Sequence, residues 1–71
     1  MNVHEETAKA FSELISSYDQ ESNWIYTNQA IGMLKKLDRQ LVRLYEAGCL
    51  SLKDFKKFDN MILNRSIKIE A

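Results

Sequence analysis

The chain has 71 residues, with no proline, two glycines and 45% hydrophobic residues. This composition favours helices joined by short connections and argues against a β-sandwich or barrel, which needs many turns. Its ten basic and ten acidic residues balance, and a chain of this length forms one domain, residues 1–71, with a small core. We therefore expect part of its stability to come from self-association or from a bound partner.

Several kinds of functional site are excluded by what the sequence lacks. Cys49 is the single cysteine and His4 the single histidine, so an internal disulfide cannot form and a zinc site would lack ligands. A nucleophilic Cys49 would need a base, for which His4 is the one histidine, and no carboxylate dyad or glycine-rich phosphate loop is present. We predict no enzymatic activity, no cofactor and no metal.

The sequence also lacks the signals of a membrane or secreted protein. No apolar run approaches the roughly 20 residues of a membrane span, and residues 1–11 lack the basic start and apolar stretch of a signal peptide. A single cysteine fits a reducing compartment. We expect a cytoplasmic protein that does not enter membranes.

The first predicted helix covers residues 3–18. Asn2 can cap it, and Glu5 and Glu6 stand in the first turn, where the helix dipole favours negative charge. One broad face carries its apolar residues, which are Val3, Thr7, Ala8, Phe11, Leu14, Ile15 and Tyr18. The polar residues 19–23 form the predicted first connection.

The second predicted helix is long, covering residues 23–47, or roughly 37 Å at 1.5 Å per residue. Its apolar residues are spaced by three or four positions, at Ile31, Leu34, Leu37, Leu41 and Leu44, which is one face of a helix. Gly32 costs such a helix about 1 kcal/mol relative to alanine and suggests a close helix crossing or a bend. A break near residues 27–28, giving two shorter helices, is the alternative.

A helical hairpin is predicted at the C-terminal end of the chain. Gly48 can adopt the left-handed conformation that ends a helix, and Ser51 can cap the next one, with Asp54 in its first turn. The third predicted helix covers residues 52–65, and residues 66–71 are expected to be extended or frayed. The fold class is therefore all-α, with three helices, a long central helix and a C-terminal antiparallel hairpin.

Residues 41–63 resemble the SHOCT (short C-terminal) helical hairpin. This segment is about a third of the chain, and its matching positions are Leu41, Leu44, Gly48, Leu50, Ser51, Asp54, Phe55, Ile62 and Leu63. This resemblance implies a small module for oligomerisation or partner binding, and it implies no catalytic residue.

Charge is divided unevenly along the chain. Residues 1–30 hold one basic and five acidic residues, a net charge of −4, and residues 31–71 hold nine basic and five acidic residues, a net charge of +4. This asymmetry can orient one helix or one subunit against another, or form a basic surface for phosphates. The candidates for such a surface are seven basic residues of the predicted hairpin: Lys35, Lys36, Arg39, Arg43, Lys53, Lys56 and Lys57.

Aromatic residues are more numerous than one small helix face needs. The candidates for partner binding are Trp24, Tyr26, Tyr45 and Phe58, because aromatic side chains dominate interface hot spots; the alternative is that they fill the core. We predict a non-enzymatic regulator, adaptor or inhibitor that binds a protein through apolar helix faces and forms a homodimer. A DNA-associated regulator that binds phosphates through the basic hairpin is the alternative.

Overall fold

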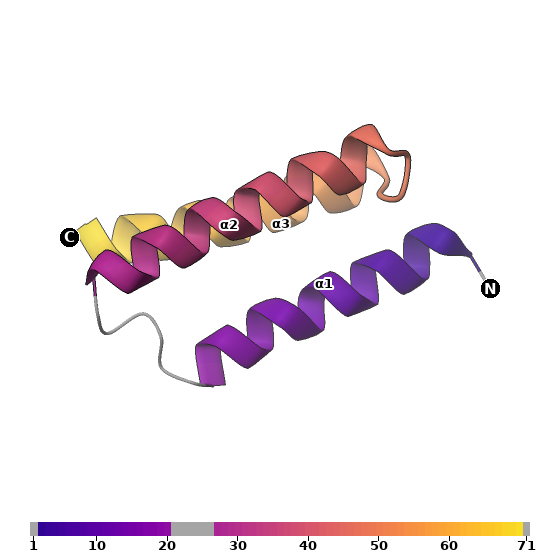
Figure 1. Ribbon diagram of the computed structural model, residues 1–71. Helices are drawn as coiled ribbons and strands as arrows, with labels where there is room; N and C mark the ends of the chain where they lie inside the picture. Colours follow the sequence, from indigo (N-terminus) through magenta and orange to yellow (C-terminus); the bar gives the residue numbers. More distant parts are fainter. Residues whose placement is uncertain (1, 21–26, 71) are drawn as a thin grey trace.

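The computed structural model describes residues 2–20 and 27–70, which form three α-helices (Figure 1). They are α1 (Val3–Gln20), α2 (Thr27–Glu46) and α3 (Leu52–Glu70). No strand occurs in these two ranges, and the predicted all-α, three-helix fold is confirmed. Residues 21–26, on which the predicted helix start at residue 23 and the alternative of a break near residue 27 depend, lie outside the described residues.

The two helix starts that the sequence marks with capping residues have the predicted hydrogen bonds. The main-chain N–H of His4 donates to Asn2 Oδ1 at 2.9 Å, and that of Asp54 donates to Ser51 Oγ at 3.2 Å. The first main-chain hydrogen bond of α3 follows, from Phe55 N to Ser51 O at 2.9 Å. Each cap gives a partner to an N–H group that the helix itself cannot satisfy.

Gly48 ends α2 as the sequence predicts, with a φ angle of 78°. Its N–H donates to the carbonyl of Tyr45 at 3.0 Å, and the N–H of Cys49 donates to the carbonyl of Leu44 at 2.9 Å. This pair of bonds satisfies two carbonyls at the helix end and reverses the chain. As a result α2 and α3 are antiparallel and lie side by side (Figure 1).

Both α1 and α3 extend beyond their predicted ends. The prediction that residues 66–71 are extended or frayed is wrong for residues 66–70, because α3 continues as a helix to Glu70. The ion pair between Arg65 on α3 and Asp19 on α1 lies directly before this segment and joins the two helices there.

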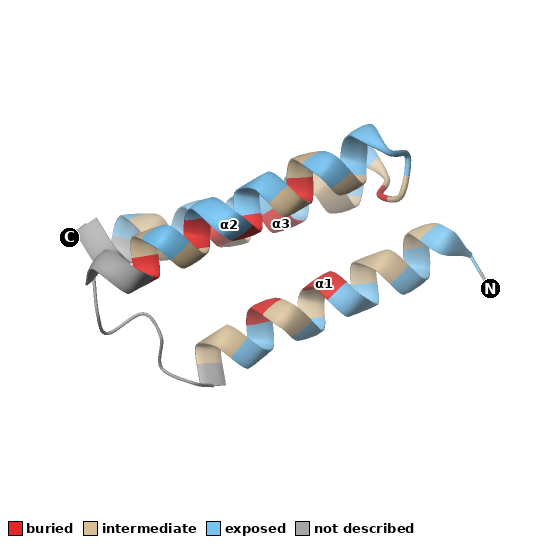
Figure 2. Cartoon of the chain, in the orientation of Figure 1, coloured by how far each residue is buried: buried red, intermediate tan, exposed pale blue. Residues whose placement is uncertain are grey.

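The core lies between the three helices, where their buried residues face one another (Figure 2). Phe11 from α1 packs edge-on against Phe58 from α3, with ring centroids 4.9 Å apart. The buried residues are Phe11, Ile15, Ala30, Leu34, Leu37, Leu41, Leu50, Phe58 and Ile62. Each large side chain contributes about 1.5–3 kcal/mol by leaving water, so the apolar face of α1 is what attaches it to the hairpin.

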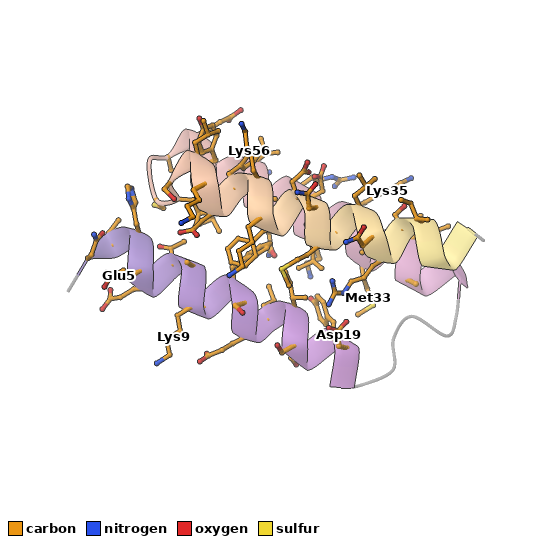
Figure 3. All side chains as sticks on the ribbon, turned by 180° about the vertical axis from the view of Figure 1, so that it is seen from behind. Glu5, Lys9, Asp19, Met33, Lys35 and Lys56 are labelled. Carbon is orange, nitrogen blue, oxygen red and sulfur yellow. The ribbon has the colours of Figure 1, made fainter. Side chains whose placement is uncertain are left out.

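Polar contacts hold α1 at both of its ends. The ring Nε2 of His4 donates to the carbonyl of Gly48 at 2.9 Å, at the turn between α2 and α3. At the other end, Asp19, labelled in Figure 3, forms an ion pair with Arg65. Helix α1 therefore runs antiparallel to α2, with its N-terminal end beside the hairpin turn (Figure 1).

Gly32 does not mark a close helix crossing. It is exposed in α2, and a Cβ atom added to it would meet no atom within 4 Å. Among residues 2–20 and 27–70, none of the helices combines the length and apolar character that crossing a membrane requires.

Candidate protein-binding surface

An apolar groove of about 680 Å³ lies between α1 and the C-terminal half of α2. Its lining residues are Glu6, Thr7, Ala10, Phe11 and Leu14 from α1 and Gln40, Arg43, Leu44 and Ala47 from α2 and the turn. The volume falls within the range of about 300–1,000 Å³ that is usual for binding pockets. Ala10 on α1 and Ala47 at the turn contribute only short side chains to this lining.

The two edges of this groove carry opposite charges. Glu6 is exposed on the α1 edge and Arg43 on the α2 edge, and neither has an ion-pair partner among the described residues. Glu13 follows Glu6 by two helical turns, and Lys36 precedes Arg43 by two turns, so each lies on the same flank of its helix as its neighbour. The groove thus has an apolar floor, an acidic α1 edge and a basic α2 edge.

A smaller apolar surface surrounds the hairpin turn. The rings of Tyr45 on α2 and Phe55 on α3 pack at a centroid distance of 4.6 Å, while 38% of Tyr45 and 51% of Leu52 stay exposed. Tyr45 was predicted to bind a partner, and the structure places it on the surface, where one side of its ring remains accessible.

Two exposed apolar residues on α3 were missed by sequence reasoning about partner binding. Leu63 is 53% exposed and Ile67 is 57% exposed, and their spacing of four residues places them on one flank of the helix. The sequence shows this spacing, but it indicates a shared helix flank only if Ile67 is helical, and residues 66–71 were not expected to be.

Of the aromatic candidates for partner binding, the structure describes Tyr45 and Phe58, and their surroundings differ. Phe58 is 1% exposed and packs in the core, so its side chain is not on the surface that a partner could contact. This is the alternative that the sequence left open, in which an aromatic residue fills the core. Trp24 and Tyr26 lie outside the described residues.

The seven basic residues predicted to bind phosphates are all exposed, but they form two groups. The α2 group is Lys35, Lys36, Arg39 and Arg43, and the α3 group is Lys53, Lys56 and Lys57. Lys35 and Lys56 lie at different places along the hairpin (Figure 3). A second groove, of about 250 Å³, places Lys35 beside two carboxylates, those of Asp38 and Asp59, so the basic surface is interrupted by negative charge.

Within residues 2–20 and 27–70, no group of three or more His, Cys, Asp or Glu side chains is placed to hold a metal ion. The ring of His4 is engaged by the carbonyl of Gly48, and Cys49 is half-buried in the turn. No protein-family model, curated protein or solved structure matches this chain. The similarity of residues 41–63 to the SHOCT hairpin therefore stays a prediction.

Proposed function

We propose that this protein is a small non-enzymatic module of the cytoplasm that regulates, adapts or inhibits by binding a protein through its apolar helix surfaces, with self-association as part of its function. The observation that carries the proposal is the apolar groove between α1 and α2. A protein of this size buries only a small apolar core. An accessible apolar groove on such a protein is therefore the surface that a partner would cover.

The shape and chemistry of the groove suit a helix better than a polar ligand. The groove runs between two helices, its floor is built from apolar side chains such as Leu14 and Leu44, and its charges stand at the edges. An amphipathic helix docks in this way, with its apolar stripe on the floor and its polar flanks at the rim. The resemblance to the SHOCT hairpin supports the same class of function, because it implies oligomerisation or partner binding.

A matched pair of variants on α1 tests this proposal. Ala10→Arg places a bulky charged side chain in the groove, and Ser16→Arg places the same side chain on an exposed part of α1 outside it. Both positions are exposed, so both variants should keep the helical circular dichroism of the wild type. Proximity labelling in cells that express each form would then identify the proteins that contact it, including further copies of this chain.

The proposal expects one set of labelled proteins for the wild type and for Ser16→Arg, and loss of that set for Ala10→Arg. An identical set from all three forms would contradict it, because the groove would then have no role in binding.

The alternative function, phosphate binding by a DNA-associated regulator, is supported by the exposure of all seven hairpin lysines and arginines. It is weakened by the carboxylates of Asp38 and Asp59 beside Lys35. Salt distinguishes the two functions. The affinity for phosphates falls steeply as the salt concentration rises, because phosphate contacts release counterions, whereas the affinity of apolar docking does not.

A further inference from the structure

We infer that the occupant of the α1–α2 groove is a second copy of this chain, packed so that α1 of each copy covers α2 of the other. The two copies are related by a twofold axis parallel to the helices. This inference rests on the proposed function, since it names the partner of the same groove and adds the orientation in which that partner binds.

The first step is the register of α1 against α2. Contacts at both ends of α1, from His4 to Gly48 and from Asp19 to Arg65, fix α1 lengthwise on the hairpin. Glu6 and Arg43 line the same groove; Glu6 lies two residues after His4 and Arg43 lies five residues before Gly48, so the two residues are within about one helical turn of each other along it. Because the helices are antiparallel, two turns forward from Glu6 and two turns back from Arg43 lead in the same direction, to Glu13 and Lys36.

The second step is symmetry. In a twofold dimer the same patch is used on both subunits, so the patch must be complementary to itself. An axis parallel to the helices exchanges the α1 side with the α2 side and leaves each level unchanged. Glu6 then faces the partner's Arg43, and Glu13 faces the partner's Lys36, while the reciprocal contacts form on the other side of the axis.

The third step is the exclusion of the competing arrangement. A twofold axis across the helices, in the plane of the interface, would instead place α1 against α1 and α2 against α2. Acidic edges would then meet acidic edges, and basic edges would meet basic edges, which is unfavourable at an interface. The opposite charges on the two edges therefore select one of the two face-to-face arrangements.

The apolar floor provides the attraction that the charges orient. Ala10 is exposed, and Leu14 and Leu44 are half-buried beside it, so a second copy would remove all three from water. Charge pairs at the rim of an interface set its orientation and association rate more than its affinity. Self-association also gives a core of nine buried residues the additional burial that small domains usually need.

Substitutions that reverse the charge on each edge of the groove test this arrangement. Glu6→Lys and Arg43→Glu are measured alone, as an equimolar mixture and combined in one chain, by sedimentation equilibrium and by chromatography with light scattering. Glu5→Lys is the control for the first change, because it makes the same substitution in the same exposed turn of α1 outside the groove. Lys56→Glu, on the exposed face of α3, is the control for the second.

The wild type and both controls should have twice the 8.3 kDa mass of the chain. Each single variant should raise the dimer dissociation constant at least about tenfold, because like charges meet twice in its homodimer. In the equimolar mixture every introduced charge faces an opposite one, so the two single variants should associate with each other. The double variant should form a homodimer again. Recovery in the mixture also demonstrates that both single variants are folded.

Two results would overturn the inference. One is a wild type that remains monomeric at about 0.5 mM; the other is a dimer that the single variants leave unchanged or that the mixture does not restore. If the wild type is monomeric and Ala10→Arg still abolishes the labelling of other proteins, the groove holds a foreign partner. The dimer inference then fails while the proposed function stands.

Discussion

Asp19 of α1 and Arg65 of α3 are 46 positions apart in the chain and form a bidentate ion pair. Arg65 Nε donates to Asp19 Oδ1 at 2.9 Å, and Nη2 donates to Oδ2. The remaining nitrogen, Nη1, donates to the carbonyl of Met61 at 2.9 Å. Hydrogen bonding to Asp19 raises the pKa of Arg65, against the opposing effect of partial burial. The pair therefore joins the C-terminal part of α1 to the second half of α3.

Asp19→Asn should lower the free energy of unfolding by about 1 kcal/mol, because it replaces a charge-assisted pair that is only partly shielded from water. A group whose pKa is raised on folding contributes its stability below its unfolded pKa and loses it only as the pH rises through the folded value. For Arg65 that window lies at strongly alkaline pH. Urea unfolding at about pH 6 and at about pH 9 should therefore give the same penalty.

Glu46→Gln is the control for this change, because it also neutralises a carboxylate, one that is exposed on α2 and outside the proposed charge pairs, and it should alter stability by less than about 0.5 kcal/mol. Equal stability of Asp19→Asn and the wild type would show that the ion pair does not help to hold α1 on the hairpin.

The same substitution at the two glycines should have opposite effects on stability. A Cβ atom would meet no atom within 4 Å at either Gly32 or Gly48, so backbone conformation alone distinguishes them. Gly32→Ala should stabilise the protein by up to about 1 kcal/mol, because alanine is the better helix former. Gly48→Ala should destabilise it by about 1–2 kcal/mol, because its φ of 78° is unfavourable for a residue with a Cβ. Thermal unfolding followed by circular dichroism measures both changes, and shifts of the same sign would contradict this account.

Phe58→Ala should lower the stability of the fold rather than remove a contact with a partner. It removes a ring that is 1% exposed and packs against Phe11, and such truncations cost about 3–5 kcal/mol, a large part of the stability of a small domain. Leu63→Ala, on the same helix but 53% exposed, should change stability by less than about 0.5 kcal/mol. Urea unfolding compares the two variants, and a Phe58→Ala protein as stable as Leu63→Ala would show that Phe58 is not part of the core.

Local signals in the sequence were enough to predict the caps and the turn. Asn2, Gly48 and Ser51 act on backbone groups a few residues away, so their roles can be recognised without the rest of the fold. The ends of α1 and α3 were different, because Asp19 and Arg65 hold each other across the fold. The polar residues 19–23 were predicted to form a connection, and residues 66–71, in which polar and apolar residues alternate, were predicted to be extended or frayed.

The candidate site could be predicted only in part, for a similar reason. The apolar faces of α1 and α2 can be recognised from helical periodicity, but periodicity does not determine how closely the two faces approach. The groove is lined by residues that are far apart in the sequence, such as Ala10 and Ala47, and only the folded chain brings them together. The sequence likewise could not separate Phe58, which is buried, from Tyr45, which is exposed, because both are aromatic residues on apolar faces.

The basic hairpin provides the last prediction, which decides between protein and nucleic-acid binding. We expect no measurable binding of a random-sequence DNA duplex at physiological salt, because Asp38 and Asp59 lie beside Lys35 and interrupt the positive surface. Fluorescence anisotropy of a labelled duplex of about 20 base pairs, at about 50 and about 200 mM salt, measures this. If Lys53, Lys56 and Lys57 each contacted a phosphate, binding at the lower salt would weaken about 40-fold at the higher. Binding with that salt dependence, lost in Lys56→Glu but kept in Glu5→Lys, would favour the DNA-associated regulator, because only the first change reverses a charge on the basic hairpin.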